Sequence, residues 1–210
     1  MQASAARDFL RVGITGGIGS GKTLVCSLFE KRGLPVISAD AVAKEIMQAD
    51  ADLRRGLSAI LGPSTYHADG TLDRAFVATK IFSDRALQRK VNRLVHPKVV
   101  EEIERRFAAM RESGCRIGVV EAALVYESGL DKDLDVVIVV DAPEATRIDR
   151  VVGRDAASPD EVRRRINAQL PSEQKAGKAD FVIRNTGSLA ELESSVQFLY
   201  TLLHTISGKR

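Results

Sequence analysis

Eight consecutive residues near the start of the chain have the types and spacing of a phosphate-binding loop. They run from Gly16 to Thr23 as GGIGSGKT and match the pattern G-x-x-x-x-G-K-[ST] at every position. Glycines permit positive φ values and let backbone N–H groups approach phosphate oxygens closely. The loop therefore predicts a nucleoside triphosphate site, in which Lys22 contacts the β- and γ-phosphates and the Thr23 hydroxyl ligates Mg²⁺. The expected nucleotide-binding residues are Gly17, Ile18, Gly19, Ser20, Gly21, Lys22, Thr23 and Leu24.

The residues on either side supply the elements that this motif requires. Val12–Thr15 is a short apolar run that predicts a buried strand, and Leu24–Lys31 has apolar residues at helical spacing. Strand, loop and helix in this order place N–H groups at a helix N-terminus, which favours an anionic phosphate. A glycine-rich turn that happens to precede a helix is the alternative interpretation.

The composition is that of an ordinary soluble protein. The 210 residues are 44% hydrophobic and 28% charged, which suits one compact α/β domain with room for a helical insertion. The net charge of +3 suits phosphate handling and does not call for nucleic acid. No apolar run approaches the ~20 residues of a membrane span. Two cysteines without metal-type spacing fit a reducing cytosol, so we expect a cytoplasmic protein. We also expect a monomer or a small homo-oligomer.

Strands and helices alternate over much of the chain, which predicts an α/β fold with a parallel sheet covered on both faces. We expect a core formed by residues 11–49 and 114–206, with flexible ends at residues 1–10 and 207–210. The expected strands cover residues 11–15, 34–38, 117–121, 136–140 and 181–183.

Residues 50–113 show only helical periodicity, which predicts a helical insertion. The expected helices cover residues 51–61, 73–82, 85–95 and 97–111, and Pro97 separates the last two. A later helix, opened by Pro143, precedes an arginine-rich segment over residues 154–178. In small phosphoryl-transfer enzymes such a segment is a lid that closes over ATP, and the helical insertion would then form the acceptor pocket.

The phosphate loop alone does not distinguish kinases from GTPases and motor ATPases. A GTPase should carry an N-K-x-D-like tetrapeptide after a late strand, whereas the last expected strand is followed by Asn185-Thr186-Gly187. The chain is short for a motor ATPase, and no apolar run ends in a paired Asp-Glu. These features and the arginine-rich segment favour a small kinase.

Further motifs, in order along the chain, resemble those of the dephospho-CoA kinase family over residues 12–199. They are ITGGIGSGKT at 14–23, SAD at 38–40, GTLDR at 70–74, IFSD at 81–84, HP at 96–97, EAALVYE at 121–127, RVVGRD at 150–155, AQ at 168–169 and ADFVIRNTG at 179–187. The resemblance implies a P-loop NTPase three-layer fold with a five-stranded parallel sheet. It also implies transfer of the γ-phosphoryl group of ATP, with Mg²⁺, to the ribose 3′-hydroxyl of dephospho-CoA.

Asp40 is the expected general base. It follows the second strand, at the sheet edge where open α/β folds bind ligands, and a carboxylate there can orient a hydroxyl and accept its proton. The resemblance implies the same role. The alternative is an N-cap aspartate, and the two roles are compatible.

On the donor side, Arg150 and Arg154 are one helical turn apart and share a face. We expect Arg154 to contact phosphate as a catalytic residue beside Lys22, while Arg150 binds the nucleotide or serves the structure. Asn185 resembles the position that borders adenine, with a plain turn asparagine as the alternative. Glu121 lies near the acidic position that holds Mg²⁺ through water, although the family usually has Asp there.

On the acceptor side, the resemblance implies contacts from Asp40, Lys44, Arg74, His96 and Glu127. His96 also fits a helix start before Pro97, and Glu127 a helix cap. Arg74 likewise fits either a substrate-binding or a structural role. Four positions depart from the family pattern and indicate a divergent member, and they are Ser38, Lys44, Ala123 and Arg147.

Two other functions fit parts of the sequence. Another small-molecule kinase, of the nucleoside or nucleoside-monophosphate type, would share the phosphate loop and lid but differ in the insertion. A non-enzymatic ATP-binding regulator with a decayed acceptor site would explain the departures at Ser38 and Lys44, but retention of Asp40, Lys22 and Arg154 argues against it.

Overall fold

The computed structural model describes residues 9–208, without the side chains of residues 82 and 83. The chain divides into two compact units. One comprises the chain up to Ser38 and from Phe107 onward, and the other comprises Ala39–Arg106.

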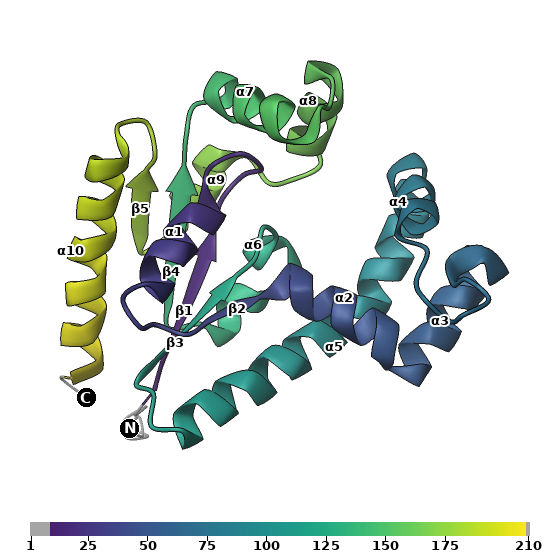
Figure 1. Ribbon diagram of the computed structural model, residues 1–210, viewed down its shortest axis with the longest axis horizontal. Helices are drawn as coiled ribbons and strands as arrows, with labels where there is room; N and C mark the ends of the chain where they lie inside the picture. The colour runs from purple at the N-terminus through teal and green to yellow at the C-terminus, as the bar shows by residue number, and fades with distance from the viewer. Residues whose placement is uncertain (1–8, 209–210) are drawn as a thin grey trace. The chain divides into compact units, whose positions relative to one another are not determined.

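The first unit is built on a parallel five-stranded sheet (Figure 1). The strands lie in the order β2-β3-β1-β4-β5, and every neighbouring pair is parallel. This arrangement confirms the predicted α/β class and the five-stranded parallel sheet. The strands are β1 (Leu10–Thr15), β2 (Val36–Ser38), β3 (Ile117–Glu121), β4 (Val136–Asp141) and β5 (Phe181–Arg184).

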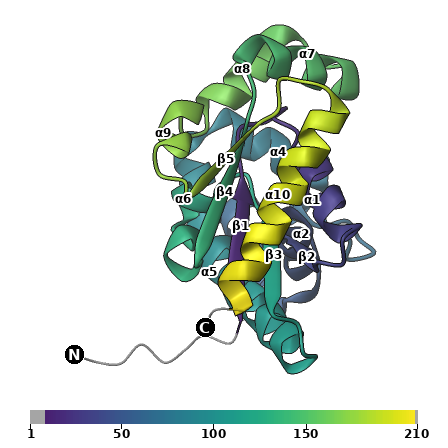
Figure 2. The same cartoon turned by 90° about the vertical axis from the view of Figure 1, so that its left-hand side faces the viewer.

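Helices cover both faces of this sheet, giving three layers (Figure 2). On one face, α1 (Lys22–Glu30) and α10 (Leu189–Gly208) bury apolar side chains such as Phe29 and Leu203 against the strands. The opposite face carries α6 (Val125–Ser128), a short 3-10 turn η2 (Leu130–Asp133) and α9 (Ser172–Ala176). Beyond the carboxyl end of β4 lie α7 (Glu144–Asp155) and α8 (Pro159–Asn167).

The second unit is helical and has a core of its own. It contains α2 (Ala39–Ala49), α3 (Ala51–Leu61), the 3-10 turn η1 (Pro63–Thr65), α4 (Arg74–Ser83) and most of α5 (Arg85–Glu112). Aspartates cap two of these helices: Asp50 accepts hydrogen bonds from the first turn of α3, and Asp73 accepts one from Phe76 N at 2.8 Å. The buried core residues are Leu53, Leu57, Leu61, Val77, Val91 and Val95.

The expected break at Pro97 is wrong, because α5 runs unbroken through it. Proline removes one N–H from the helix, and a 28-residue helix retains the bonds on either side. Val91, Val95 and Ile103, all buried, stabilise the segments before and after the proline. His96 therefore lies within a helix and does not precede one.

Two other boundaries differ from the sequence expectation. β2 begins at Val36, two residues after the expected start. It is followed directly by α2 from Ala39, so Asp40 lies in the first turn of a helix. Arg154, the expected start of the lid, lies in the last turn of α7.

The expected flexible ends are partly ordered in the described residues. Phe9 is buried, its ring lies 5.8 Å from that of Phe107, and β1 already begins at Leu10. The last helix extends to Gly208, while residues 1–8 and 209–210 lie outside the described part of the chain. Over residues 9–208, none of the helices combines the length and apolar character that a membrane crossing requires.

The stability of the sheet depends on the buried interior strand β4. Ile138 lies in β4 between β1 and β5 and is fully buried. We expect Ile138→Ala to lower the free energy of unfolding by about 2–5 kcal/mol, because it leaves a cavity in a packed core. The control is Phe198→Ala on α10, whose side chain is 67% exposed and whose loss should change stability by less than about 0.5 kcal/mol. Urea unfolding measures both, and equal losses would contradict the assigned core.

Candidate active site

The phosphate loop between β1 and α1 adopts a conformation that only glycine tolerates at key positions. Gly16 and Gly21 have φ values of 149° and 98°. A Cβ on Gly16 would collide with the carbonyl oxygen of Val140, and a Cβ on Gly21 would collide with the side-chain amide of Asn185. The loop therefore packs closely against the ends of β4 and β5.

Lys22 begins α1, and its side chain folds back along the loop. The ammonium donates to the carbonyl oxygens of Gly16 at 2.9 Å and Gly17 at 3.3 Å, and only 9% of the residue is exposed. The hydroxyl of Ser20, in the same loop, is buried without a hydrogen-bond partner. A buried cation among converging backbone groups suits a phosphate ligand.

Two side chains from later elements donate hydrogen bonds to the backbone of the loop. The Asn185 side-chain amide donates to the Ser20 carbonyl at 2.8 Å, and Arg150 donates to the same oxygen at 3.4 Å. Arg150 also donates to the carbonyl oxygen of Asn185 at 3.2 Å. The structure thus brings Arg150 and Asn185 to the loop, and the expected contact of Asn185 with adenine stays a prediction.

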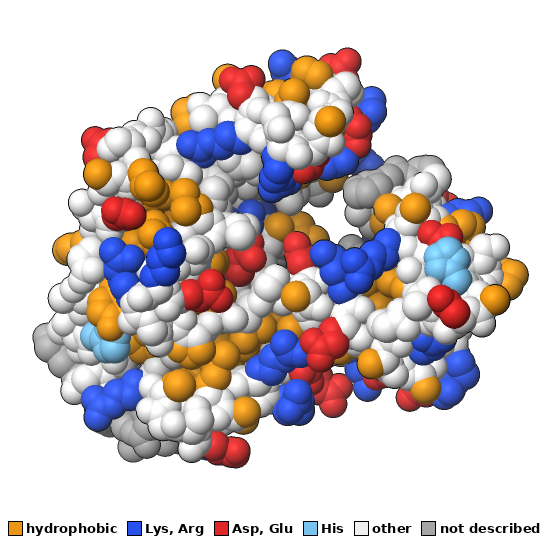
Figure 3. Space-filling model, viewed as in Figure 1, with side chains coloured by type: hydrophobic (Ala, Val, Ile, Leu, Met, Phe, Trp, Pro, Cys, Tyr) orange, Lys and Arg blue, Asp and Glu red, His pale blue; other side chains and the backbone are white. Residues whose placement is uncertain are grey.

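Side chains of both charges gather on the surface over α7 and α8 (Figure 3). The side chain of Arg154, in the last turn of α7, is 63% exposed and donates two hydrogen bonds to Asp155, at 2.7 and 3.1 Å. Asp155 also accepts a hydrogen bond from Arg165 at 3.2 Å. The hydrogen bond from Arg154 lowers the pKa of Asp155, and the same bond raises the pKa of Arg154. Both groups are ionised at neutral pH, and the phosphate contact of Arg154 stays a prediction.

The segment between α8 and α9 bridges the phosphate loop and α6. The side-chain oxygen of Gln169 accepts a hydrogen bond from the Ile18 N–H at 3.1 Å. The next residue, Leu170, donates its N–H to Glu127 at 2.9 Å. We call Gln169 and Leu170 the lid strap, because they belong to the segment that the sequence predicts to be a lid. In the sequence, Gln169 was visible only as part of a family motif.

Lys175 completes this attachment and was missed by the sequence reasoning. Its side chain is fully buried, and its ammonium contacts the Glu127 carboxylate at 2.8 Å and the carbonyl oxygen of Ala123 at 2.7 Å. No sequence signal distinguishes Lys175 from the other cations of this polar segment. Glu127 is held by groups of the chain itself in this structure, and its expected acceptor contact stays a prediction.

The other expected acceptor residues belong to the helical unit. Asp40 and Lys44 are exposed and one turn apart on α2, so they share a face. Arg74 is the first residue of α4 and is exposed. His96 is half-buried in α5, and burial lowers its pKa, so it is neutral at pH 7.

The expected Mg²⁺ ligands lie at the ends of neighbouring elements. Thr23 is exposed in the first turn of α1, and Glu121 ends β3 in register with Ile14 of β1. Residues 9–208 contain no cluster of three or more acidic, His or Cys side chains that could hold a metal ion. A hydroxyl and one carboxylate still fit Mg²⁺, which keeps several waters and binds substrate phosphates in such sites.

Known proteins resemble this chain over nearly its whole length. A family model described as dephospho-CoA kinase matches residues 10–191. The dephospho-CoA kinase of Chlorobaculum tepidum is 40% identical over 96% of this chain and 98% of its own length. A crystal structure described as TT1252 from Thermus thermophilus has a TM-score of 0.79 at 31% identity, covering 93% of this chain and 98% of that one. Dephospho-CoA kinase from Campylobacter jejuni has a TM-score of 0.69 at 25% identity, covering 95% and 98%.

The buried pair of Lys175 and Glu127 yields a stability prediction. Lys175→Met leaves the Glu127 carboxylate without its counter-ion, and we expect a loss of about 3–5 kcal/mol in the free energy of unfolding. Combining it with Glu127→Leu should recover much of this loss, because no uncompensated charge remains. Lys132→Met, at an exposed lysine of the same unit, is the matched control. A loss no larger than that of the control, measured by urea unfolding, would show that the pair is not stabilising.

Proposed function

Because the chain belongs to the dephospho-CoA kinase family, we propose that it transfers the γ-phosphoryl group of ATP to the ribose 3′-hydroxyl of dephospho-CoA. The products are CoA and ADP. The main support is the phosphate loop, which is complete and has its lysine buried against it. This loop lies within the region matched by the family model, residues 10–191. The helical unit that follows β2 supports an acceptor site, and we assign the acceptor-binding role to this unit and the lid role to residues 154–178.

On the donor side, the loop N–H groups and Lys22 bind the phosphates and offset their charge. Thr23, and Glu121 through water, would hold Mg²⁺, which neutralises charge on the β- and γ-phosphates when bound. Arg154 exchanges its exposed partner Asp155 for the transferred phosphoryl group when the lid closes. This exchange costs little because exposed ion pairs contribute about 0–1 kcal/mol.

On the acceptor side, Asp40 orients the 3′-hydroxyl and accepts its proton. Lys44 and Arg74 bind the anionic groups of the acceptor as exposed cations. His96, whose pKa is lowered by burial, contributes a hydrogen bond. Glu127 contributes a carboxylate from α6, where it also accepts the Leu170 N–H. Both cysteines are free thiols, which supports our assignment to the cytoplasm.

The test is a coupled assay of ADP release with a series of acceptors. Dephospho-CoA should support rapid release, whereas AMP, CMP and adenosine should not. Release with a nucleoside or a nucleoside monophosphate instead would assign the chain to that kinase type. A chain that forms no ADP with any of them would be an ATP-binding regulator.

Asp40 gives a separate prediction about the chemical step. Asp40→Asn should lower turnover by at least ~100-fold, the low end of general-base contributions, while ATP binding is retained. The matched control is Asp52→Asn, an exposed aspartate in the first turn of α3. Steady-state kinetics and nucleotide titration measure the two effects, and near-normal turnover of Asp40→Asn would rule out the role.

A further inference from the structure

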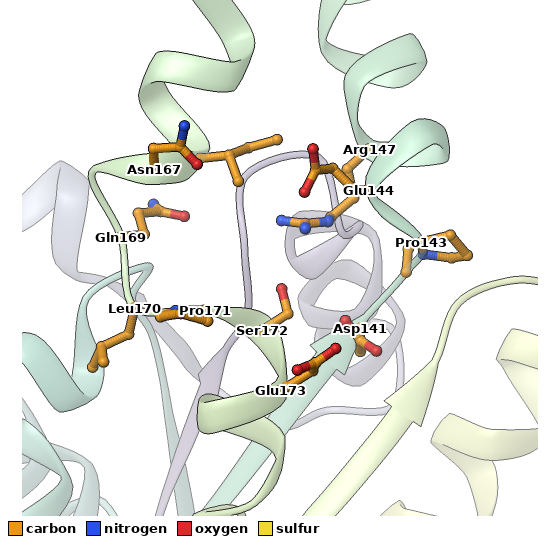
Figure 4. Close-up of a pocket in the computed structure, with 12 residues that line it drawn as sticks. Asp141, Pro143, Glu144, Arg147, Asn167, Gln169, Leu170, Pro171, Ser172 and Glu173 are labelled. Atoms are coloured by element: carbon orange, nitrogen blue, oxygen red, sulfur yellow. The ribbon is translucent and has the colours of Figure 1, made fainter.

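A cavity of about 520 Å³ lies between α7, the α8–α9 segment and the carboxyl end of β4 (Figure 4). All of its lining residues belong to the unit that contains the sheet. Lys22, Arg150 and Asn185, the donor-side contacts proposed above, do not line it. The cavity therefore lies beside the phosphate loop and does not include these three donor-side residues.

Arg147 projects from α7 into this cavity (Figure 4). The residue is only 6% exposed, and its Nε is buried without a hydrogen-bond partner. No carboxylate of residues 9–208 lies within ion-pair distance of the guanidinium. A buried charge without a counter-ion costs several kcal/mol, and a guanidinium has five donors to satisfy. Arg147 therefore faces a place where an anion would be stabilised.

Polar groups of the phosphate loop and α9 converge on the same place. A Cβ built on Gly17 would collide with Nη1 of Arg147 and would lie 3.3 Å from the Ser172 hydroxyl. The guanidinium and the hydroxyl, which both belong to residues that line the cavity, therefore lie close together beside the backbone of Gly17. The side chain of Gln169, which holds the Ile18 N–H, lines the same space.

Carboxylates constrain what the cavity can hold. Asp141, Glu144 and Glu173 line it together with Arg147 (Figure 4). Three acids repel a bare polyanion, but they accept hydrogen bonds from hydroxyl or amino groups. The ligand that fits has one anionic group for Arg147 and several donors for the acids. The volume lies within the range of small-molecule sites.

We propose that this cavity is a second small-molecule site, which binds a phosphate monoester of a polyhydroxy compound. Arg147 and Ser172 bind the phosphate group, and Asp141, Glu144 and Glu173 accept hydrogen bonds from the hydroxyl groups. The site is independent of the acceptor in the proposed kinase reaction.

The position of Arg147 links ligand binding in the cavity electrostatically to ligand binding at the phosphate loop. The Arg147 guanidinium lies against Gly17, so its positive charge also favours a triphosphate bound in the loop. A phosphate monoester at Arg147 offsets that charge and adds its own negative charge. The two ligands therefore weaken each other's binding, and by linkage they do so to the same extent.

Ribose 5-phosphate is the probe, titrated into protein saturated with a non-hydrolysable ATP analogue and Mg²⁺. The arginine Nε–H resonances report on the site, and that of Arg147 should shift with ribose 5-phosphate but not with ribose. Inorganic phosphate should cause a smaller shift, because it lacks the hydroxyl groups. No shift of the Arg147 resonance with ribose 5-phosphate would overturn the proposal.

Two variants test whether binding depends on Arg147 itself or only on the net charge of the protein. Arg147→Gln should weaken ribose 5-phosphate binding by about tenfold or more, the effect of losing a hydrogen bond to a charged group. Arg116→Gln, which removes the same charge from an exposed position directly before β3, should leave binding unchanged. Equal binding by Arg147→Gln and the wild type would overturn the assignment.

Two further measurements keep the test decisive. Ribose 5-phosphate should weaken binding of the ATP analogue to the wild type but not to Arg147→Gln, and an equal effect on both would overturn the coupling. Thermal unfolding verifies that Arg147→Gln is folded. If it is not, Ser172→Ala replaces it, and unchanged affinity in that variant counts against the site. None of these readouts uses the kinase reaction, so failure here is distinct from failure of the proposed activity.

Discussion

The structure depends on holding a short stretch of backbone in a conformation that it would not keep by itself. Gly16, Gly19 and Gly21 all have positive φ, so the phosphate loop has little intrinsic preference for its shape. Its order comes from groups outside the motif. Asn185 and Arg150 bind the carbonyl of Ser20, and Gln169 binds the N–H of Ile18. These bonds fix the N–H groups before a nucleotide arrives, which is what electrostatic stabilisation of phosphoryl transfer requires.

The same contacts divide the proposed lid into a fixed part and an exposed part. Its C-terminal part is attached to the sheet unit through the lid strap and through the buried pair of Lys175 and Glu127. At the other end, Arg154 and Arg165 share the carboxylate of Asp155 near the surface. Breaking the buried contacts is costly, whereas exchanging the exposed ones is not. The lid closure that we propose for Arg154 would therefore be confined to the last turn of α7, to α8 and to the turns beside it.

Local sequence signals predicted the elements that are determined locally. Strand 117–121 and helix 51–61 were placed at their observed bounds, and the phosphate loop follows from its spacing alone. Pro97 was misread as a break because the packing of Val91, Val95 and Ile103 on either side of it is not visible in the local sequence. Lys175 could not be found from the sequence either, because burial of a lysine is decided by a carboxylate 48 positions away, at Glu127.

Two buried cations of the same unit show how this fold treats charge. Lys175 is compensated within the protein, by Glu127 and the carbonyl of Ala123, so its contribution is to hold α9 in place. Within the described residues Arg147 has no such partner, and its charge is directed at the phosphate loop and at a polar cavity. In our proposal, its compensation comes from a ligand that the cavity binds. The electrostatic field at the phosphate loop is therefore set partly by a residue outside the GGIGSGKT motif, and any anion that approaches Arg147 from the cavity side alters that field.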